Sequence, residues 1–345
     1  MAPITIKDVA KIAGVSARTV SRVINQDENV SDRTRKRVLE VVEETGFRVN
    51  LLAQSLRNKK TGILFAFVSE KDNAFLGEFH NVTIQYLNEA ARKLGYKMIV
   101  SQSNADRIKE DQHDGFYLLT NGYADGAVIF DTKDVDERLT YLIEKQIPFV
   151  VVGKDKHNSE SSYVNLDNYR AGYMGAEHLI EQGYKKIRFF LGSKNYTVNE
   201  DRSKGYLDAL KAKKMKALPI DYGIINPETA YDKMKEILST DQWPDAVFVS
   251  GDMRAMGVYH AIYEKGLKIP QDIAVLGIDD IPMARFSHPP LSSINQFPEK
   301  MAVEAIRLLN EQIENGEVGR GEHVIFDPEL KVRQSTTRAW IDERF

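Results

Sequence analysis

Apolar residues in the first turns of the chain recur at helical spacing. They predict a helix from Ile6 to Ala13, and Thr5 with Asp8 three residues later has the form of a capping box at its start. Gly14 can adopt the left-handed conformation that ends a helix and allows a second one to follow at once. A helix, a glycine turn and a second helix are typical of a helix-turn-helix unit.

The second predicted helix begins after Ser16, a suitable N-cap, and its apolar stripe comprises Val20, Val23 and Ile24. Its outer side carries Ala17, Arg18, Ser21, Arg22 and Asn25. In the major groove of DNA, arginine can bind guanine and asparagine can bind adenine by paired hydrogen bonds. The alternative is an ordinary helical hairpin with a charged solvent face. We favour DNA binding because the glycine turn and the outward Arg and Asn side chains occur together.

A third helix is predicted from Val30 to Thr45, with Ser31 as N-cap. Its apolar side is expected to contain Val38, Leu39, Val41 and Val42. The first turns also carry four cations, Arg33, Arg35, Lys36 and Arg37. Cations there oppose the helix dipole, so either phosphate contact or a solvated face has to account for them.

From Gly62 onward, short apolar runs alternate with stretches of helical periodicity, which predicts repeated βα units and parallel sheets. The first set of expected strands is 62–68, 96–101, 126–130 and 147–152, with helices at 79–94, 116–121 and 135–145. The pattern restarts with strands at 187–191, 246–250 and 273–278 and helices at 169–182, 202–211 and 253–265. Two α/β lobes are therefore expected rather than one large sheet.

Polar residues follow most of these strands. Ligands of open parallel sheets bind beyond the carboxyl ends of the strands, so these positions are candidate ligand contacts. They include Ser69, Asp131, Lys154, Ser193, Asp252 and Asp279. Ordinary turns also favour such residues, and only their convergence from two lobes favours a binding site.

Charge is distributed unevenly along the 345 residues. The net charge is −3 overall, but residues 1–60 carry +5 and the remainder carries −8, as expected for a DNA-bound sensor. No apolar run could cross a bilayer and a helix replaces a secretory segment at the N-terminus, so we expect a cytoplasmic protein. The chain has no cysteine, no close histidine pairing and no nucleotide-binding or nucleophile-elbow motif. We therefore expect neither a metal nor another cofactor, and no enzymatic activity.

The ordered motifs IKDVAKIAGVSARTVSRVIN, VSDRTRKRVLEVVEETGF and NLLAQSL resemble the headpiece of the lactose/galactose/purine repressor family of bacterial regulators. The resemblance implies an all-α helix-turn-helix headpiece (1–48), a hinge helix and linker (49–61) and an α/β periplasmic-binding-protein-like body of two parallel-sheet lobes (62–345). It places the N-lobe at about 62–162 and 293–325 and the C-lobe at about 163–292 and 326–345. In the family the hinge becomes helical on the minor groove, where Leu56 matches a leucine wedge. Val49 and Gln54 depart from the proline and arginine often found there.

The resemblance also implies two sets of contact residues. DNA contacts are expected from Thr5, Ser16, Ala17, Arg18, Thr19, Ser21, Arg22, Asn25, Val30, Arg33, Asn50, Ala53, Gln54 and Leu56. Effector contacts are expected from Ser69, Phe75, Asp131, Lys154, Ser193, Tyr196, Arg202, Asp252, Asp279 and Gln296. Arg202, at a predicted helix start, matches a family arginine that binds effector hydroxyls or a carboxylate, and Asp279 matches an aspartate that accepts from sugar hydroxyls. Gly251 and the pair Gly153 and Lys154 depart from the family pattern.

The function expected from these features is a sugar-responsive transcriptional repressor that binds operator DNA as a homodimer or tetramer. The segment IDDIPMARFSHPPLSSI resembles galactoside-responsive members, which favours a mono- or disaccharide effector. Two alternatives remain open, namely a cytoplasmic sugar-binding protein of the same fold and a purine-type co-repressed regulator.

Overall fold

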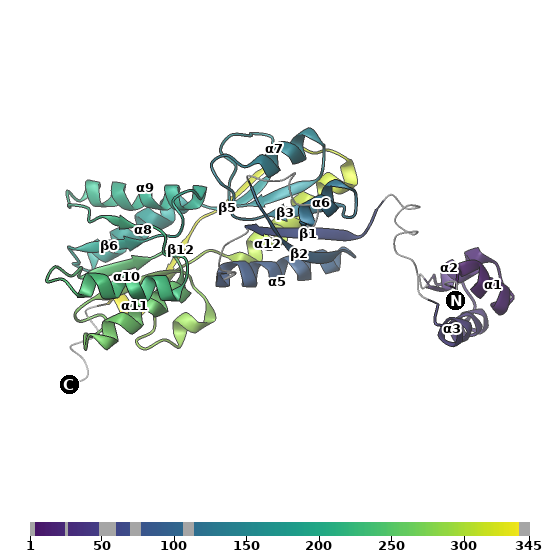
Figure 1. Ribbon diagram of the computed structural model, residues 1–345, viewed down its shortest axis with the longest axis horizontal. Helices are drawn as coiled ribbons and strands as arrows, with labels where there is room; N and C mark the ends of the chain where they lie inside the picture. The colour runs from purple at the N-terminus through teal and green to yellow at the C-terminus, as the bar shows by residue number, and fades with distance from the viewer. Residues whose placement is uncertain (1–3, 25–26, 48–59, 70–76, 106–113, 338–345) are drawn as a thin grey trace. The chain divides into compact units, whose positions relative to one another are not determined.

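The computed structural model describes residues 4–24, 27–47, 60–69, 77–105 and 114–337. These residues form two compact units, a headpiece that ends at Thr61 and a body that begins at Gly62. The helices and strands of each unit are labelled in Figure 1.

The headpiece consists of helices α1 (Ile6–Ala13), α2 (Ala17–Ile24) and α3 (Asp32–Thr45). The predicted capping box of Thr5 and Asp8 is present, and Gly14 ends α1 at φ 63° in the left-handed region. Eight small apolar side chains make the headpiece core, namely Val9, Ala10, Ala13, Val20, Val23, Val30, Val38 and Val41.

Two headpiece residues lie where the sequence did not place them. Leu39, predicted on the apolar side of the third helix, is 47% exposed. Val30, predicted as a DNA contact, has its side chain buried in the core. Val30 precedes the N-cap Ser31, so its side chain packs under the entry to α3 rather than facing solvent.

The N-lobe of the body is built on a six-stranded sheet in the order β11-β5-β4-β3-β1-β2. Its strands are β1 (Ile63–Ser69), β2 (Lys97–Ser103), β3 (Gly126–Ile129), β4 (Phe149–Val152), β5 (Tyr163–Leu166) and β11 (His323–Phe326), all paired in parallel. Helices α5 (Glu78–Lys93), α6 (Gly115–Thr120), α7 (Glu137–Glu144) and α12 (Pro298–Asn315) accompany it. Two apolar cores, one on each face of the sheet, hold the helices to it.

The C-lobe has a second six-stranded sheet in the order β12-β10-β9-β8-β6-β7. Its strands are β6 (Ile187–Phe190), β7 (Ile220–Asp221), β8 (Ala246–Val249), β9 (Ala274–Asp279), β10 (Ser292–Asn295) and the antiparallel β12 (Glu329–Lys331). Helices α8 (Asn168–Glu181), α9 (Thr197–Ala212), α10 (Pro227–Leu238) and α11 (Asp252–Glu264) cover its two faces, and 3₁₀ turns occur at Pro282–Arg285 and Gln334–Thr336.

The chain crosses between the lobes slightly later than the sequence predicted. Strand β5 belongs to the N-lobe sheet, and β10 belongs to the C-lobe sheet. The chain therefore crosses between the lobes after β5, after β10 and after β11. The sequence predicted the first two crossings before β5 and before β10. Strand pairing across the sheet decides this assignment, and hydrophobic periodicity along the chain does not contain that information.

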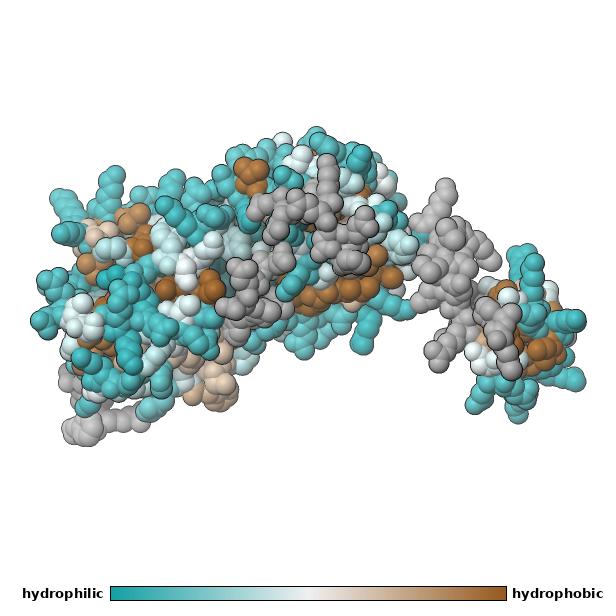
Figure 2. Space-filling view, in the orientation of Figure 1, coloured by the Kyte–Doolittle hydropathy of each residue, from teal (hydrophilic) through white to brown (hydrophobic). Residues whose placement is uncertain are grey.

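Strand β2 also departs from its prediction as a doubly buried strand. It lies at the edge of the N-lobe sheet, and Ile99 and Val100 are 43% and 45% exposed. An edge strand pairs on one side only, and none of the described residues fully covers the side chains of Ile99 and Val100. On the face shown in Figure 2, apolar residues are scattered among hydrophilic ones.

Candidate functional site

The headpiece presents a polar surface along its second helix. Arg18 and Arg22 are exposed, whereas Val20 and Val23 point into the core. Ser16 Oγ accepts a 3.1 Å hydrogen bond from the Thr19 backbone nitrogen and so caps α2, as predicted. The helix-turn-helix geometry thus leaves the Arg side chains free to enter a groove.

Arg22 is oriented by a neighbour that the sequence analysis did not single out. Its Nε donates a 2.8 Å hydrogen bond to Asp27 Oδ2, which leaves the two terminal nitrogens to face outward. The Arg22 guanidinium lowers the pKa of the Asp27 carboxyl to about 2, so the pair stays charged at neutral pH. Of the other predicted DNA contacts, Thr5, Ser16 and Arg33 are exposed, and Ala17, Thr19 and Ser21 are half-buried. Asn25, Asn50, Ala53, Gln54 and Leu56 lie outside the described residues.

The body contains a cavity of about 500 Å³ lined by residues of both lobes. The strand ends of both sheets contribute to it, as the rule for open parallel sheets requires. Its polar lining comprises His80, Asp131, Thr132, Asn165, Asn168, Ser193, Tyr196, Asn199, Arg202, Ser250, Arg254, Asp279 and Gln296, and its apolar lining includes Phe79, Phe130, Val152, Leu166, Val198, Ile225 and Met301.

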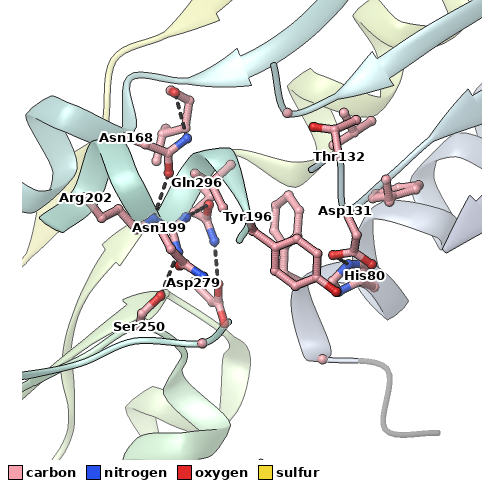
Figure 3. Close-up of a pocket in the computed structure, with 18 of the residues that line it drawn as sticks. His80, Asp131, Thr132, Asn168, Tyr196, Asn199, Arg202, Ser250, Asp279 and Gln296 are labelled. Carbon is pink, nitrogen blue, oxygen red and sulfur yellow. Dashed lines mark hydrogen bonds and ion pairs between the residues drawn. The ribbon is translucent and has the colours of Figure 1, made fainter. Parts of the chain in front are cut away.

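Arg202 is the centre of a hydrogen-bond network at the C-lobe side of the cavity (Figure 3). Its Nε donates to Asn168 Oδ1 at 2.7 Å, and its terminal nitrogens donate to Ser250 Oγ at 2.8 Å and Gln296 Oε1 at 2.7 Å. Three of its five N–H donors are therefore bound to protein, and two remain for a ligand. Burial lowers the pKa of Arg202 to about 10, which still leaves it a cation at neutral pH. Helix α9 begins at Thr197, so Arg202 lies in its second turn and not at its start as predicted.

Asp279 ends strand β9 and continues this network. Gln296 Nε2 donates a hydrogen bond to Asp279 Oδ1, so Gln296 links the aspartate to Arg202. Burial raises the pKa of the Asp279 carboxyl, while the nearby charges of Arg254 and Arg202 act in the opposite direction. The carboxylate therefore lies among donors and cations rather than in solvent.

On the N-lobe side, Asp131 and His80 form a second polar pair. His80 Nε2 lies 3.0 Å from Asp131 Oδ1, and Asp131 Oδ2 accepts from the Ser69 backbone nitrogen at 3.2 Å. The other ring nitrogen of His80, Nδ1, is buried and has no hydrogen-bond partner among the described residues. In Figure 3 the Tyr196 ring lies between this pair and the Arg202 network. The cavity thus has polar groups at two ends and an aromatic ring between them.

Three predicted effector contacts are absent from the described lining. Ser69 contributes its backbone to Asp131, and Lys154 forms an ion pair with Asp201 instead of facing the cavity. Asp252 is fully buried beneath the cavity, where Ser293 Oγ and the Ile281 backbone nitrogen donate to its carboxyl at 2.6 and 3.0 Å. Each of these groups is bound to another part of the protein, Lys154 as a donor to Asp201 and Asp252 as an acceptor from Ser293 and Ile281. Phe75 lies outside the described residues.

Sequence reasoning missed several lining residues, and some of the polar ones lie on helices. Asn168, Asn199 and Arg254 occupy the first turns of α8, α9 and α11. Helices of a βα unit begin where the preceding strand ends, so the signal was present in the βα spacing.

The fold and the cavity define a ligand-responsive DNA-binding regulator with a helix-turn-helix headpiece and a two-lobed sensor body. Residues 5–50 match the model of the bacterial regulatory proteins of the lacI family, and residues 176–336 match a periplasmic binding protein-like domain. Among curated proteins, the HTH-type transcriptional repressor PurR of Pasteurella multocida (strain Pm70) is 31% identical, with 96% of this chain and 98% of that protein covered. PurR of Histophilus somni (strain 129Pt) is 32% identical, with coverage of 96% and 98%. The chain belongs to the lacI family of bacterial regulatory proteins.

Solved structures agree with this assignment. A transcriptional regulator CelR–cellobiose complex is 28% identical, with a TM-score of 0.71 and coverage of 96% of this chain and 99% of that one. The lac repressor dimer bound to operator and the anti-inducer ONPF shares the fold at 23% identity, with a TM-score of 0.81 and coverage of 97% and 99%. The predicted fold class, a helix-turn-helix headpiece with a body of two parallel-sheet lobes, is confirmed. No helix in the described part of the chain is long and apolar enough to span a membrane.

Proposed function

We propose that this protein is a sugar-responsive transcriptional repressor whose effector binds in the cavity between the lobes and changes the affinity for operator DNA. The observation that supports a sugar most is the composition of the cavity. Thirteen of its lining residues carry polar side chains, supplied by both lobes. A polyhydroxylated ligand needs many directed donors and acceptors to replace its lost water, together with an apolar face for its ring.

The geometry of the Arg202 network supports the same proposal. Asn168, Ser250 and Gln296 hold the Arg202 side chain from three sides, so its two remaining N–H donors have a fixed direction. Asp279 offers a carboxylate oxygen to hydroxyl donors from the neighbouring strand. The protein already holds this donor pair and this acceptor in place. Adjacent ring hydroxyls can therefore bind to them without the entropy cost of ordering these side chains.

A purine effector is the second candidate, because the relatives named above are PurR repressors. The CelR–cellobiose complex, whose protein is 28% identical to this chain, favours a saccharide instead. A flat heterocycle requires two apolar faces and few polar contacts, whereas this cavity has polar side chains from both lobes beside its apolar lining. The saccharide therefore remains the leading proposal.

We propose a homodimer as the functional unit. Strand β2 leaves an unpaired edge in which Ile99 and Val100 are both exposed, and a second copy of the chain could cover it. Two headpieces related by a twofold axis would read a pseudo-palindromic operator. Sedimentation velocity of the full-length protein distinguishes this dimer from a tetramer formed by two dimers.

The hinge at 49–61 is proposed to order only on specific DNA, with Leu56 as a wedge between base steps and Ala53 beside it. The segment is too short to form a stable helix alone. Leu56→Ala should then weaken operator binding much more than binding to random DNA. An equal loss on both would remove the wedge from the mechanism.

The proposal as a whole is tested by selecting bound fragments from random genomic DNA with the full-length protein, in the presence and absence of saccharides and purines. We expect one enriched pseudo-palindromic site whose recovery changes with a saccharide. A site that responds to purines alone would replace the sugar by the second candidate. Recovery of no enriched site in any arm would contradict DNA regulation itself.

A further inference from the structure

The guanidinium of Arg254 is the feature of the cavity that its protein partners do not explain. Arg254 is the third residue of α11 and lines the cavity. Among the described residues, no hydrogen bond or ion pair reaches its side chain, whereas Arg202 has three. A cation in the first turn of a helix also opposes the helix dipole. A half-buried guanidinium that lines a cavity and has no protein partner in the described part of the chain is available to a ligand with a negative charge.

The backbone around Arg254 leaves space for its side chain. A Cβ atom at Gly251 would come within 3.0 Å of Arg254 Nε and 3.2 Å of its Cζ. A Cβ atom at Gly192 would approach Arg254 Nη1 to 3.4 Å. The guanidinium therefore lies beside two glycines that follow strands β8 and β6, where a larger residue would crowd it.

The acidic groups of the cavity are already bound to other donors. Asp131 accepts from His80 and the Ser69 backbone, and Asp279 accepts from Gln296. The negative charges of Asp279 and Asp131 stabilise the Arg254 cation at a distance, without a hydrogen bond or ion pair to it. Arg254 therefore lines a cavity in which both carboxylates already accept hydrogen bonds from other groups. Its own N–H donors have no such partner among the described residues.

The helices that begin at the cavity add positive potential. Helices α5, α9 and α11 start from Gly77, Tyr196 and Gly251, and none of the three has a side-chain cap. Helices α8 and α10 of the same body are capped by Asp167 and Asn226. These uncapped helix starts place the positive end of the helix dipole at the cavity, which favours an anion, although the Asp252 backbone N–H of α11 already donates to the Asp279 carboxyl.

We propose that the effector is an acidic saccharide, a polyhydroxylated ring or chain with a carboxylate or phosphate group that Arg254 binds. This inference rests on the proposed saccharide response and specifies its ligand class. The hydroxyls would occupy the Arg202, Gln296 and Asp279 side of the cavity, and the anionic group would receive two parallel N–H donors from Arg254. His80 also lines this cavity, but its Nδ1 is buried and lacks a hydrogen-bond partner among the residues that the structure describes, so we assign it no ligand contact.

The test is calorimetric titration of the full-length protein with matched neutral and acidic sugars. The carboxylate arm compares galactose with galacturonate and lactose with lactobionate, and the phosphate arm compares galactose with galactose 6-phosphate. At least one acidic member should bind roughly tenfold to a hundredfold more tightly than its neutral counterpart, as expected for charge-assisted hydrogen bonds. The arm that shows this preference identifies the anionic group.

Arg254→Met, which keeps the length of the side chain without its charge, should abolish that preference and leave the weak binding of the neutral sugar. Arg285→Met removes an exposed arginine outside the cavity lining and should keep the preference. Thermal unfolding of both variants shows whether they fold.

The outcomes separate this inference from the proposed function. Neutral sugars that bind as tightly as their acids, or an Arg254→Met protein that keeps the preference, would overturn the role of Arg254 and leave a sugar-responsive repressor. Binding of hypoxanthine or another purine with no saccharide binding would overturn both. Failure of every acidic sugar to bind would overturn the inference as well.

Discussion

The ammonium group of Lys154 donates a 2.6 Å hydrogen bond to Oδ2 of Asp201, and this contact joins the end of β4 in the N-lobe to α9 in the C-lobe. Two further contacts lie beside it. Lys156 forms an ion pair with Glu200, and the backbones of Lys133 and Tyr196 form an isolated bridge. The body is therefore in an arrangement in which the two lobes touch at the mouth of the cavity.

These contacts should favour the closed arrangement of the lobes, and effector that binds the closed form should bind less tightly without them. Lys154→Ala and Asp201→Ala are each expected to weaken effector binding by about 0.5–1 kcal/mol, because the pair is only partly buried. The double variant should lose no more than either single one. Calorimetric titration of the three variants measures this coupling, and additive losses would show that the ion pair does not act as a unit.

Asp279→Asn should keep the fold and lose the response to sugar. The asparagine oxygen can still accept from Gln296, so the network with Arg202 survives, but the charged acceptor for ligand hydroxyls is gone. We expect a loss of about 1–3 kcal/mol in effector binding with operator binding unchanged in the absence of effector. Unchanged effector affinity in the folded variant would place the hydroxyl contacts elsewhere in the cavity.

Arg202→Ala should behave differently from Asp279→Asn. It would leave the buried acceptors of Asn168, Ser250 and Gln296 without their donor, so it should lower the free energy of unfolding as well as effector affinity. Arg202 thus supports the cavity in addition to its expected ligand contact. Chemical denaturation of the two variants in parallel measures the difference, and equal stabilities would contradict the supporting role.

In the headpiece, Arg18→Ala and Arg22→Ala should relax base preference, each at a cost of about 1–3 kcal/mol on the preferred site, because both side chains are exposed on α2. Lys36→Ala on α3 is the control and should weaken all DNA sequences alike. Binding to a library of operator variants distinguishes the two effects. An unaltered preference in both arginine variants would rule out α2 as the reading helix.

Val100→Glu should shift the protein from dimer to monomer, because it places a charge in the exposed apolar edge strand β2. Val135→Glu introduces the same change at a position that is 73% exposed outside this strand, and it should remain dimeric. Sedimentation velocity at several concentrations reports the molecular mass. A dimeric Val100→Glu protein would exclude this edge from the interface.

The buried carboxyl of Asp252 should make the free energy of unfolding depend on pH. Burial, reinforced by Asp279, raises its pKa from 3.8 to about 8, so between those values the folded protein holds a proton that the unfolded chain releases. Stability from this group is therefore greatest at low pH and falls as pH rises from about 4 to about 8, by at most about 1.4 kcal/mol per pH unit. Asp252→Asn should reduce this slope in urea unfolding measured from pH 5 to 8, and Glu299→Gln, an exposed carboxyl, should not. Equal slopes in the native and Asp252→Asn proteins would refute the buried proton.

The sequence by itself determined the features that depend on neighbouring residues. The capping box of Thr5 and Asp8, the left-handed Gly14 and the apolar spacing of α1 and α2 are local, so the headpiece followed from the order of residues. The βα periodicity likewise determined two lobes and located the cavity at the strand ends, where Asp131 and Asp279 were expected and are found.

Only the tertiary structure decided which polar residues share the cavity and which serve the fold. Lys154 and Asp252 follow strands as Asp279 does, yet one pairs with Asp201 across the lobes and the other is bound by Ser293 and Ile281 below the cavity. Arg254 lies in the first turn of a helix, where the βα spacing places a residue near the strand ends but does not show that its side chain lines the cavity. The direction of a side chain at a strand end or in a first helical turn depends on the crossing strands β5, β10 and β11, which pair with residues distant in the sequence. Local periodicity records secondary structure, whereas those long-range pairings determine which side chains meet.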